Sequence, residues 1–148
     1  MKSDLFITPD QAHNLLTLVQ GGSTAAAQEV PVGALIHDPN GWVVSVAGNT
    51  PIAHCDPTAH AEIQAMRLAS HRLTSYRLTT CNLVVSLQPC PTCTQATALA
   101  RLQEVRFLAA QGKENGLKAT KISSVKQSDS AFVDAGEAML KNFFEIRR

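Results

Sequence analysis

The sequence predicts a single α/β domain over residues 1–148, with three layers (α/β/α) and a mixed sheet of about five strands. Two observations predict this fold class. Segments 32–37 and 42–47 are apolar and contain β-branched residues, and the Asp-Pro-Asn-Gly turn at 38–41 joins them into a hairpin. Further along, a segment of helical length separates two apolar runs, and that order implies a right-handed parallel crossover.

End signals and apolar spacing place the helices. Thr8 caps and Pro9 begins a first helix that ends at the glycines 21–22. A second helix begins at His60 and continues to about Arg72. Its apolar residues lie on more than one side, which suggests burial; they are Ile63, Met66, Leu68 and Ala69. The tail repeats apolar residues at helical spacing and so predicts an amphipathic helix: Phe132, Gly136, Met139, Leu140, Phe143 and Ile146.

The remaining strands are placed by short apolar runs. Cys81–Leu87 is nearly continuous in apolar character, which is typical of a strand covered on both faces. The helix that follows Cys90 is expected to turn three apolar residues inward: Ala96, Leu99 and Ala100. Val105–Ala109 is the expected parallel partner, and Ile122–Val125 is the candidate for a fifth strand.

The residues that carry chemistry lie between Asp56 and Cys93. One imidazole, His60, and two thiols three residues apart, Cys90 and Cys93, make a ligand set suited to zinc. Catalytic zinc sites use three protein ligands and leave a fourth position for water. Glu62, two residues after the histidine, is the candidate for moving the protons of that water. We therefore predict Zn²⁺ as the cofactor.

The spacing also predicts where these ligands sit. Pro91 directly follows Cys90, and proline is favoured at the first position of a helix. The thiols of Cys90 and Cys93 would then share one face of a helix N-terminus, where the partial positive charge favours thiolates. His60 must lie at the very start of its own helix, because deep within a helix His60 and Glu62 would point to opposite sides.

Simpler interpretations of the two half-motifs remain. A lone Cys-x-x-Cys can be a redox pair, and a lone His-Ala-Glu is usually an ordinary helix start. A structural zinc site would need a fourth Cys or His, and Cys55 and Cys81 lack ligand-like spacing to the cluster. The two half-motifs together favour a catalytic zinc.

Composition indicates the kind of protein and its compartment. Apolar residues make up 45% and charged residues 17%, as in a globular domain. Four cysteines, two of them assigned to the metal, argue against a disulfide scaffold and favour a reducing compartment. Neither a signal peptide nor a membrane span is evident, so we expect a cytoplasmic protein. The net charge of +1 says little about nucleic acid, although basic residues cluster late in the chain: Lys113, Lys118, Lys121, Lys126, Arg147 and Arg148.

The order His-x-Glu … Pro-Cys-x-x-Cys resembles the zinc nucleobase deaminases. Along most of its length the chain resembles the bacterial tRNA adenosine deaminases, through Glu29–Ala34, Asp56–Glu62, Tyr76–Leu78 and Phe143–Arg148. The resemblance implies a cytidine-deaminase-like fold, a homodimer, and hydrolysis of adenosine to inosine at the wobble position of a tRNA anticodon loop. It makes Glu62 the proton shuttle. It also implies five substrate contacts: Val30, Pro31, Asn49, Ala61 and Phe143.

Departures from that family cluster where specificity is set. Gln88 stands where the family has Glu, and Thr94-Gln95-Ala96 replaces a run of smaller residues. Three other functions therefore stay open: a free-base deaminase such as a guanine deaminase, a cytosine-type deaminase, and a non-catalytic zinc protein. Gln88 favours the non-catalytic zinc protein, whereas the retained Glu62 argues against it.

Overall fold

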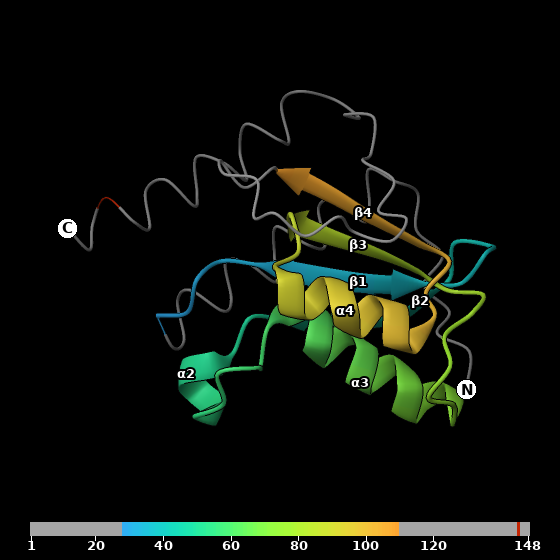
Figure 1. The fold of residues 1–148 in the computed structure, drawn as a ribbon, viewed down its shortest axis with the longest axis horizontal. Helices are drawn as coiled ribbons and strands as arrows, with labels where there is room; N and C mark the ends of the chain where they lie inside the picture. Colours follow the sequence, from blue (N-terminus) through green and yellow to red (C-terminus); the bar gives the residue numbers. More distant parts are fainter. Residues whose placement is uncertain (1–27, 110–144, 146–148) are drawn as a thin grey trace.

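A mixed sheet of four strands forms the centre of the computed structural model, which describes residues 28–109 and residue 145. The strands are β1 (Gly33–His37), β2 (Val43–Gly48), β3 (Asn82–Leu87) and β4 (Glu104–Ala109), in the order β2-β1-β3-β4 (Figure 1). β1 is antiparallel to β2 and to β3, and β3 is parallel to β4. The mixed sheet, the hairpin and the parallel pair are therefore confirmed.

Local sequence shapes the hairpin turn between β1 and β2. The Asp38 carboxylate accepts hydrogen bonds from the backbone N–H groups of Asn40 and Trp42, each at 2.9 Å. Gly41 follows with φ of 87°, a conformation that only glycine adopts without steric cost. The turn thus sets the pairing of the two strands, with Leu35 opposite Val46.

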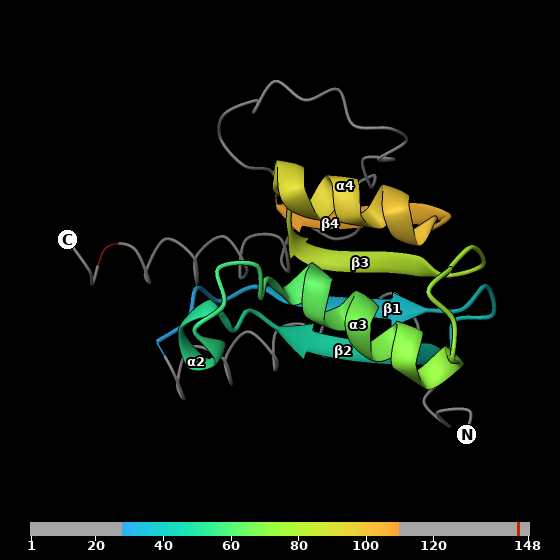
Figure 2. The same cartoon turned by 60° about the horizontal axis from the view of Figure 1, so that its bottom comes forward.

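Two helices lie side by side on one face of the sheet (Figures 1 and 2): α3 (Ala61–Leu73) and α4 (Pro91–Ala100). A third, short helix, α2 (Pro51–His54), connects β2 to the segment before α3. Among the described residues no helix has both the length and the apolar character that a membrane span requires.

The core between helices and sheet is closely packed because α3 presents alanines at four-residue spacing. Ala61, Ala65 and Ala69 are each fully buried, so the α3 backbone can approach the strands. Opposite them lie fully buried aliphatic side chains of β1 and β3, among them Ile36 and Leu83. This packing fixes the start of α3 above the sheet.

The opposite face of the sheet is apolar as well. Leu35 and Val43 are buried there, and the half-buried Val46, Val84 and Leu108 pack against them. β3 thus packs on both faces, with Leu83 and Val85 fully buried towards the helices and Val84 half-buried on the other side. The expected helices near the two ends of the chain, apart from the helical and exposed Glu145, and the expected fifth strand at 122–125 lie outside the described residues.

Two predictions about helix faces are wrong. Leu99 was expected to point inward but is 80% exposed, and Leu68 in α3 is 51% exposed. The buried side of α4 is formed by Cys93, Thr94 and Thr97, and Leu99 lies about 200° around the helix from Thr97. Two other α4 residues do pack partly buried against the core, as expected: Ala96 and Ala100.

Candidate metal centre and active site

His60 is placed by the beginning of α3. It is the residue just before the helix, in an extended conformation (φ −68°, ψ 154°), and the helix begins at Ala61. His60 and Glu62 therefore need not point to opposite sides, as they would within a regular helix. The predicted position of His60 at the start of its helix is confirmed.

The cysteine pair is placed by the beginning of α4. Cys90 is the capping residue, Pro91 occupies the first turn, and the Cys93 backbone N–H donates to the Cys90 sulfur at 3.5 Å. The Cys90 sulfur therefore caps the start of α4. Cys93 itself is fully buried.

The two helix starts bring the three ligand side chains together. The His60 Nδ1 lies 3.5 Å from the Cys90 Sγ and 3.4 Å from the Cys93 Sγ, and one ligand atom from each residue falls within 4.8 Å of the others. A tetrahedral zinc with ordinary bond lengths holds its nitrogen and sulfur ligands about 3.6 Å apart. The donor set and its spacing therefore fit zinc.

The charges at this centre also favour the binding of a cation. Burial, above all, raises the pKa of the Cys93 thiol, and the neighbouring Glu62 carboxylate and Cys90 raise it further. Two thiolates beside a carboxylate repel one another unless a positive charge lies among them. A divalent metal supplies that charge, since metal ligation deprotonates a thiol.

Glu62 lies in the first turn of α3 and is only 4% exposed. Burial is the main influence on its carboxyl group and raises its pKa, while its own backbone N–H, His60 and a hydrogen bond with Cys93 act in the opposite direction. A carboxyl group of raised pKa can hold a proton as well as release it, which is what general acid–base chemistry near neutral pH needs.

The residues expected to contact substrate are only partly placed. Asn49 directly follows β2, is 8% exposed, and donates its backbone N–H to the Val32 carbonyl at 3.0 Å. This bond puts Asn49 beside the segment that carries the half-buried Val30 and the buried Pro31. Ala61 is fully buried at the start of α3. Phe143 lies outside the described residues.

Other histidines and cysteines of the described residues stand apart from the three ligands. Cys55 is exposed and Cys81 is buried, and neither belongs to the ligand group. The His37 Nδ1 lies 2.7 Å from the Asp38 carbonyl oxygen, and the His54 Nδ1 lies 3.0 Å from the Gln64 Nε2. Within the described part of the chain, the group of side chains close enough together to hold a metal ion consists of the three predicted residues, His60, Cys90 and Cys93.

Sequence reasoning missed the contacts that hold the segment between Asn49 and His60. Glu29, 2% exposed, accepts a hydrogen bond from the Ala53 backbone N–H at 2.8 Å, and Gln64 donates to the Thr50 Oγ1 at 3.2 Å. These pairs are 24 and 14 residues apart in sequence. No local pattern signals them, because a polar residue beside an apolar run is usually exposed.

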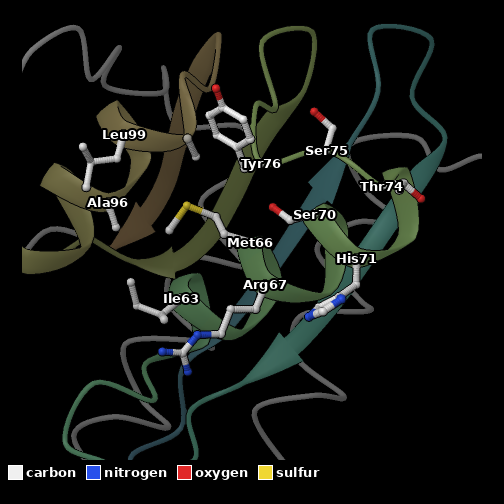
Figure 3. Close-up of a pocket in the computed structure, with 11 residues that line it drawn as sticks. Ile63, Met66, Arg67, Ser70, His71, Thr74, Ser75, Tyr76, Ala96 and Leu99 are labelled. Carbon is white, nitrogen blue, oxygen red and sulfur yellow. The ribbon is translucent and has the colours of Figure 1, made fainter.

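A groove of about 780 Å³ lies between α3 and α4, apart from the ligand residues (Figure 3). Met66 and Ala96 contribute apolar surface, and the polar Arg67 and His71 come from α3. Two of its lining side chains are largely exposed, Leu99 at 80% and Tyr76 at 74%. The groove is thus an apolar surface bordered by charge, next to the helices that carry the ligands.

Comparison with known proteins supports the interpretation of these residues as a zinc site. Residues 9–109 match the family model of the cytidine and deoxycytidylate deaminase zinc-binding region. A tRNA-specific adenosine deaminase of Agrobacterium fabrum is 30% identical over 142 residues, covering 90% of this chain and 92% of the relative. A tRNA(Ile)-lysidine synthase of Deinococcus deserti is 43% identical over 93 residues, which are 63% of this chain but only 17% of that protein. The chain thus spans a small part of that relative.

Solved structures show the same fold. One from a study of A-to-I editing by tRNA:A34 deaminases has a TM-score of 0.73 and 25% identity, covering 83% of this chain and 96% of that one. A guanine deaminase from Nitrosomonas europaea has a TM-score of 0.79 at 19% identity, covering 97% and 87%. The fold is therefore the one that the deaminases share. With its ligand set and its matching segment, the chain belongs to the family of the cytidine and deoxycytidylate deaminase zinc-binding region.

Proposed function

We propose that the chain is a zinc-dependent hydrolase that deaminates adenosine to inosine at the wobble position of a tRNA. The observation that carries the chemistry is the meeting of His60, Cys90 and Cys93 within 4.8 Å, with the buried Glu62 two residues from the histidine. The substrate is suggested by the relative of Agrobacterium fabrum, which this chain matches over 92% of its length.

Three side chains would hold the metal: His60 Nδ1, Cys90 Sγ and Cys93 Sγ. Three protein ligands leave a fourth position open, which is the arrangement of a catalytic rather than a structural zinc. When bound, zinc supplies an activated water by lowering its pKa from 15.7 towards about 7.

Glu62 moves the protons of the reaction. It takes one proton from the attacking water and gives it to the adenine ring nitrogen as the new carbon–oxygen bond forms at C6. It then passes the remaining hydroxyl proton to the amino group, and the carbon–nitrogen bond breaks to release ammonia. One water is consumed and one ammonia is released, so the atoms balance. The raised pKa of Glu62 suits a group that must accept and return a proton twice.

Asn49 is the proposed hydrogen-bonding partner of the base edge. Its backbone is fixed to Val32, its side chain is largely buried, and that side chain has no hydrogen-bond partner among the described residues. A turn asparagine that only satisfied its own backbone would show such a bond. We assign Val30, Pro31 and Ala61 to the adjoining wall, and Phe143, outside the described residues, to the substrate side as well.

We also propose that the chain works as a homodimer in the cytoplasm. The exposed apolar side chains of Leu99 and Tyr76 at the groove between α3 and α4 are the surface that a second copy would cover. A reducing compartment suits a centre built on two thiols, because oxidation to a disulfide would destroy it.

The test is a substrate panel for the zinc-loaded protein: an anticodon stem-loop with adenosine at the wobble position, free guanine, cytosine and cytidine. We expect inosine from the stem-loop alone, and the Glu62→Gln protein is the control for contaminating deaminases. Turnover of guanine alone would overturn the tRNA proposal and leave the zinc chemistry standing.

The salt dependence of substrate affinity is a second, independent way to distinguish a tRNA substrate from a free base. Each phosphate contact on a single strand steepens the fall of log affinity with log salt by about 0.7. With a net charge of +1 we expect a shallow slope for the stem-loop, on the order of two to four contacts. An enzyme acting on a free base should be nearly indifferent to salt.

A further inference from the structure

Within the segment between Asn49 and His60, α2 is held by polar contacts rather than by core packing, whereas Ala59 at the end of the segment is fully buried. The α2 helix has four residues and buries none of them, and Ile52 in its middle is 57% exposed. So short a helix has little stability of its own. Its conformation must therefore come from hydrogen bonds to its surroundings.

One of these bonds comes from a buried carboxylate far away in sequence. Glu29 lies just before β1, is 2% exposed, and its Oε1 accepts the Ala53 backbone N–H of α2 at 2.8 Å. Thr50, the residue that should cap α2, makes no side-chain capping bond. The Glu29 carboxylate therefore takes the place of the missing cap from a distance.

We propose that Glu29 is a positioning residue, which fixes α2 and through it Asn49, the residue assigned to the base edge. This inference rests on the proposed function. Burying a carboxylate is costly unless hydrogen bonds offset the lost hydration, and an apolar residue would fill the same space without that cost. The charged residue is therefore explained by the bond that it makes to α2.

Further contacts anchor both ends of the segment. The Asn49 backbone N–H bonds to the Val32 carbonyl at 3.0 Å, and the Thr50 backbone N–H bonds to the Ala59 carbonyl, next to His60, at 2.9 Å. Gln64 on α3 donates to the Thr50 Oγ1 at 3.2 Å and lies 3.0 Å from the His54 Nδ1.

These bonds tie the segment to the sheet and to the metal-binding helix. Within the described residues, the Glu29 bond links α2 to the stretch that carries Val30 and Pro31. Together with the bond from Asn49 to Val32, Glu29 thus holds Asn49 and α2 against the adjoining wall of the site.

Two conservative variants separate the hydrogen bond from the charge. Glu29→Gln keeps the length and an acceptor oxygen but loses the charge, whereas Glu29→Asp keeps the charge but is one methylene shorter. Glu104→Gln is the matched control, because Glu104 is a carboxylate on β4 that pairs with Arg106 at 2.8 Å. Three quantities are measured on the zinc-loaded proteins: amide hydrogen exchange at Ala53, zinc content, and KM and kcat with the stem-loop.

For Glu29→Asp we expect exchange at Ala53 to accelerate about tenfold or more, since the shorter side chain no longer reaches the Ala53 N–H and the hydrogen bond is lost. KM should rise roughly tenfold with kcat within about twofold, the pattern of lost ground-state binding, and zinc should stay at one per chain. Glu29→Gln and the control should behave as wild type. Unchanged exchange in Glu29→Asp, or faster exchange with unchanged KM, would overturn the inference. If the wild type fails to deaminate the stem-loop, the proposed function fails, while the exchange data still decide whether Glu29 holds α2.

Discussion

At the scale of the single residue, the chemistry of the metal centre depends on the contact between the buried Glu62 carboxyl group and the cysteine sulfurs. Glu62 is 4% exposed and contacts Cys93, so its carboxylate is both desolvated and close to a sulfur ligand. A substitution that keeps its shape and removes its charge should therefore leave the fold intact and affect only proton transfer.

The first prediction follows for Glu62→Gln. Zinc content and unfolding midpoint should match the wild type, and turnover should fall by ~10²–10⁴-fold, the usual contribution of general acid–base catalysis. Single-turnover rates with the stem-loop, together with elemental analysis, measure both. A near-normal rate would place the proton shuttle on another residue.

The second prediction concerns the ligands. Cys93→Ala should lose zinc and destabilise the chain, because the metal joins the starts of α3 and α4 and its binding energy contributes to folding. Cys55→Ala is the matched control, since this thiol is exposed and outside the ligand group. Elemental analysis and urea unfolding are the measurements, and undiminished zinc in Cys93→Ala would remove Cys93 from the ligand set.

The ligands could be predicted at this scale and Glu29 could not. The positions of His60 and Cys90 follow from local signals, a histidine before a helix start and a cysteine before a proline. The role of Glu29 depends on a bond to Ala53, 24 residues away. Glu29 becomes buried only in the folded chain, so local sequence does not reveal its burial.

At the scale of the element, the hairpin turn is the clearest case of sequence dictating structure. The third prediction is that Gly41→Ala destabilises the protein by about 1–2 kcal/mol, because Gly41 has φ of 87°, which costs a residue with a Cβ that much. Asn40→Ala is the control, since only its backbone contributes to the turn. Urea unfolding gives the difference, and equal midpoints for the two variants would contradict the prediction.

The limits of α3 and of the four strands and the start of α4 were predicted closely, and one helix face was not. Pro91 marks the start of α4 by a local signal, so sequence locates it. Which side of α4 meets the sheet depends on tertiary packing. Burial of the polar Thr94 and Thr97, in place of Leu99, could not be inferred from hydrophobicity.

At the scale of the whole molecule, the two helices that hold the ligands also form the surface with the exposed groove. α3 and α4 bury their alanine and threonine sides on the sheet, while Leu99 of α4 and Tyr76 of the loop after α3 stay exposed. The resemblance in sequence implies a homodimer, and we place its interface at this groove. That placement remains a prediction, and the exposure of Leu99 makes it testable with one side chain.

The last prediction is that Leu99→Lys dissociates the dimer and Leu68→Lys does not. Both leucines are exposed, at 80% and 51%, but Leu68 does not line the groove between α3 and α4; it lines a second hollow beside Val44 and Val46. A lysine at the centre of a buried apolar interface must lose its hydration without gaining a partner, so association should weaken strongly, while on a free surface it costs little. Light scattering at micromolar concentration should give twice the mass of one chain for the wild type and Leu68→Lys, and a single chain for Leu99→Lys with full zinc. A wild type with the mass of one chain would remove the homodimer, and a dimeric Leu99→Lys protein would move the interface to another face.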